Sequence, residues 1–229
     1  MGETHIGRRA FLQATVTMAG VLAVAGGCAT ADGPPKAPLK SKWTPLFNGT
    51  DLAGWKPEGG AVWTVDQQCI VGVQGPGAAA GDLFTDKEFG DFELRVTLKV
   101  QWPANSGIWF RYVTPDKAYQ ADILEYKDPV AYSGSLYCPG KMFIDINKDP
   151  SIVKREDWNT FVIRAQGDHL VITVNDVVTA DVHDGSFARG KIGFQIHPGD
   201  EFKDMAIRVR EVGIRALMAR STDEAPGRR

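Results

Sequence analysis

The chain of 229 residues carries a formal net charge of −2, and its residues are 43% hydrophobic and 24% charged. This composition is typical of a globular domain with enough chain to bury a substantial core. The near-neutral charge gives no electrostatic basis for binding nucleic acid, and beyond the N-terminus no stretch approaches the ~20 apolar residues that span a bilayer.

Residues 1–28 have the features of an export signal. Gly7-Arg8-Arg9-Ala10-Phe11-Leu12-Gln13 is a twin-arginine element, and an apolar run follows from Ala14 to Ala25. That run is too short and too rich in Gly and Ala for a transmembrane helix. Ala25-Gly26-Gly27-Cys28 resembles a lipoprotein processing site, with Cys28 as the lipidated residue. We therefore expect export by the twin-arginine route to the periplasm or cell envelope, with a lipid anchor in the membrane.

Residues 29–42 and 216–229 flank the domain and lack its pattern. The first segment contains three prolines and no core-forming residues, so we expect a Pro-rich tether. The second segment is expected to be a disordered tail. With Cys28 lipidated, Cys69 and Cys138 remain; they could pair in an oxidising compartment, but two unrelated buried thiols are the favoured interpretation. No Cys and His spacing indicates a zinc site.

Between these flanks, short apolar or alternating segments follow one another, with turn residues between them. Long helical periodicity is absent, and no linker or internal repeat divides the region. Residues 43–215 are therefore expected to form a single all-β sandwich or barrel, with room for one helical turn in 150–158. The expected strands are Trp43–Phe47, Val62–Val65, Cys69–Val73, Phe92–Val100, Gly107–Val113, Tyr119–Tyr126, Thr160–Ala165, His169–Val174, Val177–Val182, Gly190–His197 and Met205–Val212.

Two of these strands indicate which face is buried. In Phe92–Val100 the even-numbered residues are all apolar and the odd-numbered ones are polar, so one face belongs to the core. In Gly190–His197, Gln195 and His197 lie opposite the apolar face. Asn175-Asp176 separates two apolar strands and predicts a tight hairpin, because Asn and Asp tolerate left-handed backbone conformations.

The strand Tyr119–Tyr126 carries three hydrogen-bonding side chains. Gln120 and Asp122 share one face of a flat strand, whereas Glu125 falls on the other. A β-bulge at Ile123-Leu124 would bring all three into one groove, and bulges are common beside active sites. The alternative is a solvated strand face with one out-of-register acid.

The polar faces of the strands supply the candidate site residues. A concave sheet with acids, amides, an arginine and aromatic rings is a surface suited to sugars, because amides and carboxylates bind paired hydroxyls and rings stack on pyranose faces. Trp102 and Trp109 are available for stacking, although each is more often a core residue. The candidates are Glu93, Arg95, Arg111, Gln120, Asp122, Glu125, Gln195 and His197, with Tyr137 and Lys141 from the following loop.

Gln120-x-Asp122-x-x-Glu125 resembles the Glu-x-Asp-x-x-Glu strand of laminarinase-type glucanases. Those enzymes use the first Glu as nucleophile and the last as acid/base. Here an amide occupies the nucleophile position, and an amide cannot form the glycosyl-enzyme ester that retaining hydrolysis requires. A conventional glucanase is therefore disfavoured.

Five further motifs occur in order along the chain: Trp43-x-x-Leu46-Phe47-Asn48-Gly49-Thr50-Asp51-Leu52-x-Gly54-Trp55, Gly90-Asp91-Phe92-Glu93-Leu94-Arg95, Ala104-Asn105-Ser106-Gly107-Ile108, Trp158-Asn159 and Gly193-Phe194-Gln195-Ile196-His197. Together they resemble the 3-keto-disaccharide hydrolase domain family, and the resemblance covers about Trp43 to Arg215. It implies a concanavalin A-like jelly-roll β-sandwich with a concave ligand face, in an exported bacterial protein that acts on sugars oxidised at C3. The family strand often reads Tyr-Glu-x-Gln-Ile-Leu-Asp, so acid and amide have changed places here.

A ketone at C3 changes the chemistry that the site must provide. It acidifies the C2 proton, so a base can form an enolate, the glycosidic oxygen leaves from C1, and water adds back. Such a site needs one general base, a stabiliser for the enolate oxygen and an acid. The expected base is Asp122 or Glu125, with His197 as base or acid.

The remaining candidates are assigned to substrate binding. Arg111 or a bound divalent cation would stabilise the oxyanion, although no ligand spacing compels a metal. Gln120 and Gln195 would hold sugar hydroxyls; Glu93, Tyr137 and Lys141 complete the set. A sugar oxidoreductase is the expected partner that supplies the ketone. The alternatives are a non-catalytic carbohydrate-binding module and a structural envelope protein.

Overall fold

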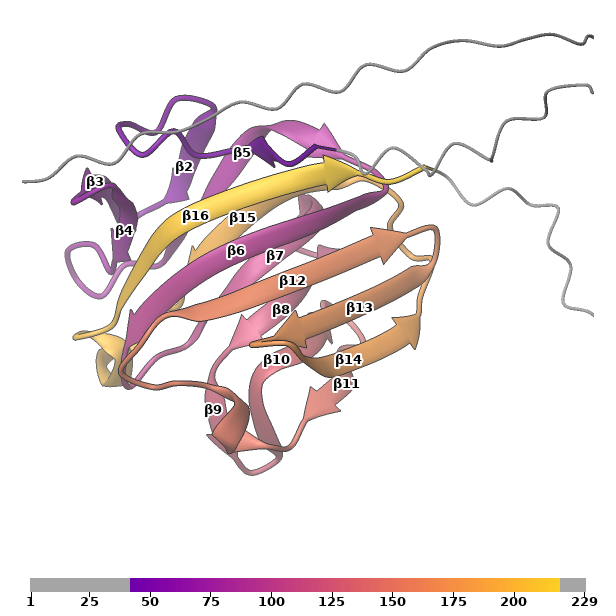
Figure 1. The fold of residues 1–229 in the computed structure, drawn as a ribbon. Helices are drawn as coiled ribbons and strands as arrows, with labels where there is room; N and C mark the ends of the chain where they lie inside the picture. Colours follow the sequence, from indigo (N-terminus) through magenta and orange to yellow (C-terminus); the bar gives the residue numbers. More distant parts are fainter. Residues whose placement is uncertain (1–41, 219–229) are drawn as a thin grey trace, which may run out of the picture. The chain divides into compact units, whose positions relative to one another are not determined.

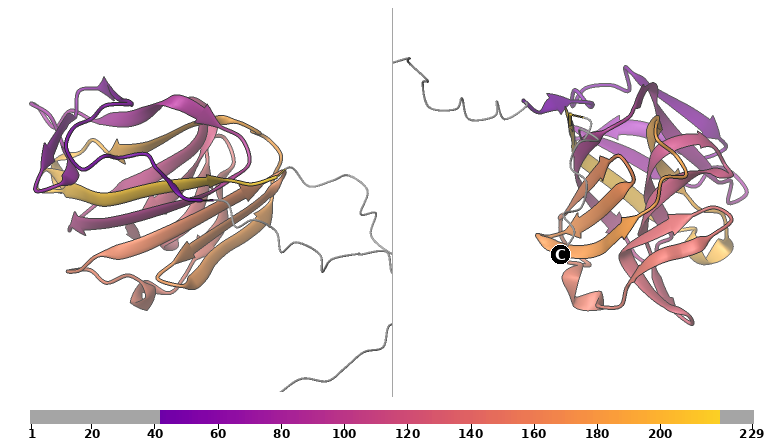
Figure 2. Two further views of the ribbon diagram at one scale, coloured as in Figure 1. Left: turned by 45° about the horizontal axis from the view of Figure 1, so that its top comes forward. Right: turned by 90° about the vertical axis from the view of Figure 1, so that its right-hand side faces the viewer.

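The computed structural model describes residues 42–218. Its strands form two antiparallel sheets packed face to face, which Figures 1 and 2 show as two layers. The all-β sandwich predicted for the domain is therefore confirmed. The export signal, Cys28, nearly all of the tether and the end of the tail lie outside the described residues. Within residues 42–218, no helix is long and apolar enough to cross a membrane.

The two sheets have eight strands each, and two short 3₁₀ turns accompany them, η1 (Pro150–Ile152) and η2 (Asp200–Phe202). The first sheet has the order β14 (Val177–His183), β13 (His169–Val174), β12 (Asn159–Gln166), β6 (Phe92–Gln101), β16 (Ala206–Ala216), β4 (Cys69–Val73) and β3 (Val62–Asp66), with β1 (Thr44–Pro45) beside β16. The second has the order β11 (Met142–Asn147), β10 (Val130–Cys138), β8 (Lys117–Ile123), β7 (Ser106–Thr114), β15 (Gly190–Ile196), β5 (Gly81–Phe89) and β2 (Trp55–Gly59), with β9 (Glu125–Lys127) beside β10.

The hydrophobic core lies between the sheets and follows the alternation in the sequence. The even-numbered residues of β6 are buried in it, as are the apolar residues of β15. The Trp55 ring from β2 stacks on Phe194 of β15, with ring centroids 5.4 Å apart. Because each strand gives alternate side chains to the core, the remaining side chains of each sheet face outward.

Three local predictions are also confirmed. Asn175 and Asp176 form the β13–β14 turn with φ of 49° and 68°, the left-handed values that a two-residue hairpin requires. The helical turn expected in 150–158 is η1. Cys69 and Cys138 are both buried and free, so they are unrelated thiols and not a disulfide.

Candidate functional site

A cleft of about 300 Å³ lies on the second sheet, on the face turned away from the core. Its walls come from β7, β8, β10, β11 and β15 and from the segments that flank them. Polar groups and aromatic rings both contribute to it. The lining residues are Asn105, Trp109, Pro115, Gln120, Asp122, Leu124, Tyr126, Tyr137, Pro139, Met142, Phe143, Gln195 and His197.

Every second side chain from Gln120 in β8 to Tyr126 in β9 points into the cleft. Gln120, Asp122, Leu124 and Tyr126 all line it. Along β10, Ala121 lies opposite Leu136 and Glu125 lies opposite Tyr132, so both strands advance by the same number of residues. No extra residue is inserted at 123–124, and the predicted bulge is wrong.

Glu125 consequently faces away from the cleft. Its carboxylate is half-buried and forms an ion pair with Arg155, and it lines a separate cavity of about 130 Å³. Leu124 separates that cavity from the cleft, since it lines both. The expectation that three polar side chains of this strand share one groove therefore holds for two of them, and Glu125 is the out-of-register acid.

The Asp122 carboxyl group forms part of the cleft floor and is only 3% exposed. No residue within 42–218 donates a hydrogen bond to it, and burial raises its pKa well above the usual range. Burial disfavours the charged form of a carboxyl group when no cation or donor compensates for the lost water. A carboxylate with a raised pKa is a stronger base than an exposed one, which suits proton abstraction from carbon.

Two amides cross the sheet beside Asp122. The Nε2 of Gln120 donates to the Oε1 of Gln195 over 3.0 Å, although β7 lies between their strands. The Gln120 side chain can pass over β7 because Gly107 has no side chain there; an added Cβ would lie 2.4 Å from Gln120 Cδ. The amide groups not used in this bond are available to hydroxyls of a ligand.

Gly107→Ala is expected to displace the Gln120 amide and weaken sugar binding. Loss of one hydrogen bond to the sugar should weaken the binding free energy by about 0.5–1.5 kcal/mol, so KM or Kd should rise roughly two- to tenfold. Titration of the variant with substrate measures this effect. Gly185→Ala is the control, because an added Cβ there has an ordinary contact of 3.6 Å. Equal binding by wild type and Gly107→Ala would contradict this role of the glycine.

His197 follows β15 and presents one free ring nitrogen. Its Nδ1 lies 2.7 Å from the carbonyl oxygen of Pro198; because a carbonyl only accepts, Nδ1 carries a hydrogen. In the neutral ring Nε2 is then unprotonated. The ring packs edge-on against Phe202, and the Gln74 side chain holds the His197 carbonyl over 2.8 Å. The imidazole is thus oriented by its neighbours, with Nε2 left for chemistry.

Aromatic rings form another part of the cleft lining. Tyr126 and Tyr137 each form a T-shaped ring pair with Phe143, and Asn105 donates to the Tyr126 hydroxyl over 3.0 Å. Burial first, and then the charge of Asp122, raises the pKa of Tyr137, so its hydroxyl stays protonated as a donor. This combination can stack on a sugar ring and bind its hydroxyls.

Several of these residues were not predicted from the sequence. Asn105 belongs to a quoted family motif, and Tyr126 follows Gln120 and Asp122 in strict alternation, so both left a signal. Met142 and Phe143 come from an adjacent hairpin whose position over the cleft depends on tertiary structure.

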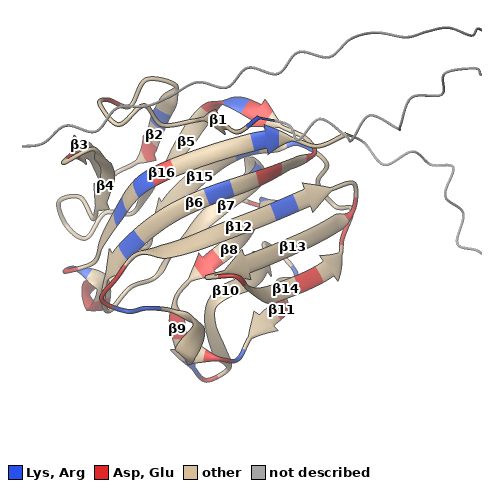
Figure 3. Cartoon of the chain, viewed as in Figure 1, with Lys and Arg blue, Asp and Glu red and all other residues tan. Residues whose placement is uncertain are grey.

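Glu93 and Lys141 are not in the cleft, contrary to prediction. Glu93 lies on the outer face of the first sheet and pairs with Arg215 over 2.7 Å; Figure 3 shows acidic and basic positions side by side on β6 and β16. Lys141 contacts Asp184 over 2.5 Å and Ser186 over 2.7 Å. The sequence of a polar strand face does not show which sheet the strand belongs to. Glu93 was therefore predicted to lie in the cleft, although its strand belongs to the first sheet.

Arg111 is fully buried away from the cleft, so its prediction as a substrate-binding residue or oxyanion stabiliser is wrong. Its guanidinium pairs with Asp91 over 2.9 Å. It also donates to the carbonyls of Gly90, Gly167 and Phe187. Arg111 therefore ties together three loops at one end of the sandwich, and its role is structural.

Among the residues that line the cleft, Asp122 and His197 are of the types that commonly bind metal ions. In the part of the chain that the structure describes, no group of three or more His, Cys, Asp or Glu residues is arranged to hold a metal ion. A requirement for a divalent cation stays a prediction, to be tested with a chelator.

Asp82 positions the Trp109 wall of the cleft and should make stability depend on pH. Trp109 Nε1 donates to its Oδ1 over 2.7 Å, while burial, and to a lesser extent Glu58, raises the pKa of Asp82 to about 6. A raised folded-state pKa means that folding is most favoured at low pH and loses this contribution between about pH 4 and 6. Asp82→Asn keeps the acceptor without the charge, so we expect a Tm about 2–4 °C higher at pH 7.5 and unchanged near pH 4.

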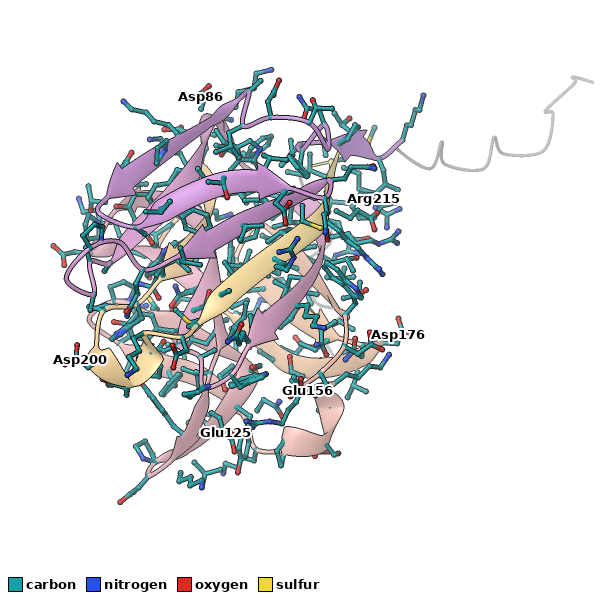
Figure 4. The ribbon with its side chains drawn as sticks, turned by 90° about the vertical axis from the view of Figure 1, so that its left-hand side faces the viewer. Asp86, Glu125, Glu156, Asp176, Asp200 and Arg215 are labelled. Carbon is teal, nitrogen blue, oxygen red and sulfur yellow. The ribbon has the colours of Figure 1, made fainter. Side chains whose placement is uncertain are left out.

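The control for this prediction is Asp86→Asn on the same strand, where the carboxylate is exposed at the edge of the molecule (Figure 4). Thermal unfolding at both pH values compares the two variants. A lower Tm for Asp82→Asn at pH 7.5 would show that the charged form stabilises the fold, against this account.

Comparison with known proteins identifies the relationship. The family model of the 3-keto-alpha-glucoside-1,2-lyase-like domain matches residues 42–214. The chain belongs to this family. The resemblance read from the sequence motifs is thereby confirmed, and no curated protein matches the chain.

Solved structures place this lyase-like domain among the concanavalin A-like and galectin-like sandwiches, as predicted. A protein provisionally called a glycosyl hydrolase, from Parabacteroides distasonis ATCC 8503, aligns with a TM-score of 0.59 and 20% identity over 77% of this chain and 100% of its own. A Bacillus subtilis protein of unknown function with a galectin-like fold gives 0.54 and 13% over 78% and 96%. The mannose-glycan-bound lumenal domain of VIP36 gives 0.54 and 12% over 78% and 90%.

Proposed function

We propose that this lyase-like domain cleaves glycosidic bonds of 3-keto-glycosides in the cleft, by C2 deprotonation and β-elimination followed by hydration. The observation that carries the proposal is the buried Asp122 carboxyl group, which lines the cleft and has no hydrogen-bond donor within 42–218. Membership of the family and the sugar-related fold relatives support a glycoside as ligand.

In the first step Asp122 takes the C2 proton, and the electron pair of that bond forms an enolate with its charge on the C3 oxygen. Donors that line the cleft, the Tyr137 hydroxyl and the Gln195 amide, would hold this oxygen. The enolate then re-forms the ketone as the C1–oxygen bond breaks, and the leaving oxygen takes a proton from Nε2 of a charged His197.

Hydration of the resulting enone reverses these roles. His197 accepts a proton from water as the water oxygen bonds to C1, and Asp122 returns a proton to C2. Both groups end in their starting protonation states, and the net reaction is hydrolysis. No carboxylate nucleophile takes part, so an amide at Gln120 is compatible with turnover.

The test is incubation of the purified protein with a 3-keto-disaccharide and, separately, with the unoxidised sugar, with and without chelator. We expect released monosaccharide from the oxidised sugar alone. Cleavage of the unoxidised sugar would instead indicate glucanase chemistry, and loss of activity on chelation would add a metal ion to the mechanism.

The second candidate function is a carbohydrate-binding module that uses the same cleft without turnover. The observation that favours it is the fold shared with the glycan-bound VIP36 domain. Sugar binding in the cleft without cleavage of any ketosugar would select this function over the lyase.

The cellular context belongs to the same proposal. An exported protein anchored at Cys28 would meet glycosides at the cell envelope, and a sugar oxidoreductase must supply the C3 ketone. Cys28→Ala is expected to release the protein from the membrane fraction, and radiolabelled palmitate incorporation measures the anchor directly. Membrane retention of this variant would contradict lipidation at Cys28.

A further inference from the structure

A second hollowed surface lies on the first sheet, on the opposite side of the sandwich from the cleft. Two adjoining hollows of about 630 and 430 Å³ share Trp158 and Arg210. We call them together the Trp158 groove; the turns Gln67–Gln68 and Asn175–Asp176 border it. Asp176 marks the groove, and Asp200, the first residue of η2, follows the cleft residue His197 by three positions. Figure 4 shows these two labelled residues on opposite sides of the molecule.

The centre of the groove is an arginine stacked on an indole. The Arg210 guanidinium lies 4.4 Å from the centroid of the Trp158 ring. Two other arginines of the same strand pair with acids, Arg208 with Asp66 over 2.8 Å and Arg215 with Glu93. Arg210 differs, since within residues 42–218 neither a carboxylate nor another acceptor bonds its guanidinium. Stacking therefore fixes a flat, exposed group with its N–H donors free for a ligand.

The border of the groove adds two amides that the fold does not use. Gln67 and Gln68 form the β3–β4 turn with φ of 48° and 60°, values that Asn-Gly adopts at lower cost. Their side chains are exposed and make no hydrogen bond to the described residues. In contrast, the Asn175 amide is occupied, because it bonds the Ile152 carbonyl and the Asn159 side chain over 2.8 Å each.

The groove carries charges of both signs, with a small excess of negative charge. Lys154 and Arg210 contribute positive charge, while Asp157, Asp176 and Glu211 contribute negative charge. A strongly anionic or cationic ligand would meet like charges, whereas neutral sugar hydroxyls can pair with amides, carboxylates and guanidinium alike. We infer that the Trp158 groove binds a neutral oligosaccharide, as a second carbohydrate site separate from the cleft. This inference is independent of catalysis.

Binding of cellohexaose, maltohexaose and laminarihexaose tests the inference, in an Asp122→Asn background that we expect to be inactive. Calorimetry measures affinity, and the indole N–H resonance of Trp158, assigned with Trp158→Phe, reports the site. We expect at least one hexaose to bind and to shift that resonance. Trp158→Ala and Arg210→Ala in the same background should each weaken binding at least tenfold.

Trp43→Ala is the matched control, because Trp43 is also stacked by arginines on this sheet but lies outside the groove. It should bind like the parent, and thermal unfolding confirms that each variant is folded. Gln120→Ala, in the cleft, should leave the ligand-induced shift of the Trp158 resonance unchanged. Failure of all three hexaoses to bind, or unchanged affinity in Trp158→Ala, would overturn the inference.

Discussion

Asp122→Asn is expected to lower kcat on a 3-keto-glycoside by about 10²–10⁴-fold, the usual contribution of a positioned general base. The amide is nearly the same size, so the cleft and the Gln120–Gln195 pair should keep their arrangement and KM should change little. Steady-state kinetics and a binding titration separate the two effects.

The same substitution should stabilise the fold at neutral pH. Burial raises the Asp122 pKa well above its usual range, so the charged form costs folding free energy as pH rises from the ordinary value toward the raised one. Asp122→Asn removes that cost; its Tm should exceed the wild-type value at pH 7.5 and approach it near pH 4. A variant that is both more stable and inactive is typical of a functional residue that the fold tolerates at a cost.

Glu125→Gln is the control, because it changes a carboxylate only three residues further along the chain. The Glu125 carboxylate lies outside the cleft and pairs with Arg155. The variant should keep most of the wild-type kcat. If Glu125→Gln abolished turnover while Asp122→Asn retained it, the assignment of the base would be reversed.

Arg111→Met is expected to destabilise the protein by about 3–5 kcal/mol, the range measured when one partner of a buried ion pair is removed. The substitution leaves Asp91 without its cation and three loop carbonyls, at Gly90, Gly167 and Phe187, without their donor. Denaturant unfolding measures the loss. Arg111→Lys should rescue only part of it, because an ammonium group cannot reproduce the planar set of donors.

The outcome also separates structure from catalysis. Measured well below its reduced Tm, folded Arg111→Met should retain the wild-type kcat, since Arg111 does not line the cleft. Arg95→Met, which removes an arginine stacked on the surface ring of Trp43, should cost little stability. A stable but inactive Arg111→Met protein would restore Arg111 as the oxyanion stabiliser.

The fold was largely predictable because most strands alternate clearly between apolar and polar residues. That alternation fixed the buried faces of β6 and β15 and placed Gln195 and His197 on the cleft side. Within β8 the same alternation predicted that Gln120 and Asp122 lie on one face. These residues come together because β8, β7 and β15 are neighbours in one sheet, and a period of two in each strand directs their side chains to the same face.

The rest depended on information that a single strand does not contain. A polar face on β6 reads the same as one on β8, so Glu93 was assigned to the wrong sheet. Arg111 follows an apolar run, but a bulged pairing and a φ of 48° turn it into the loops. For Glu125, the proposed bulge needed an inserted residue that the β10 register excludes.

The central claim is that Asp122 removes the C2 proton, and deuterium incorporation tests it most directly. Wild-type protein would cleave a 3-keto-glycoside in D₂O, and mass spectrometry of the released 3-keto-sugar would locate deuterium at C2, against an enzyme-free incubation of the product. We predict enzyme-dependent deuterium at C2, because the water that enters for hydration exchanges the proton held by Asp122 before it returns to C2. Asp122→Asn should lose both cleavage and incorporation. Cleavage with deuterium incorporation at the wild-type rate by Asp122→Asn would contradict this account.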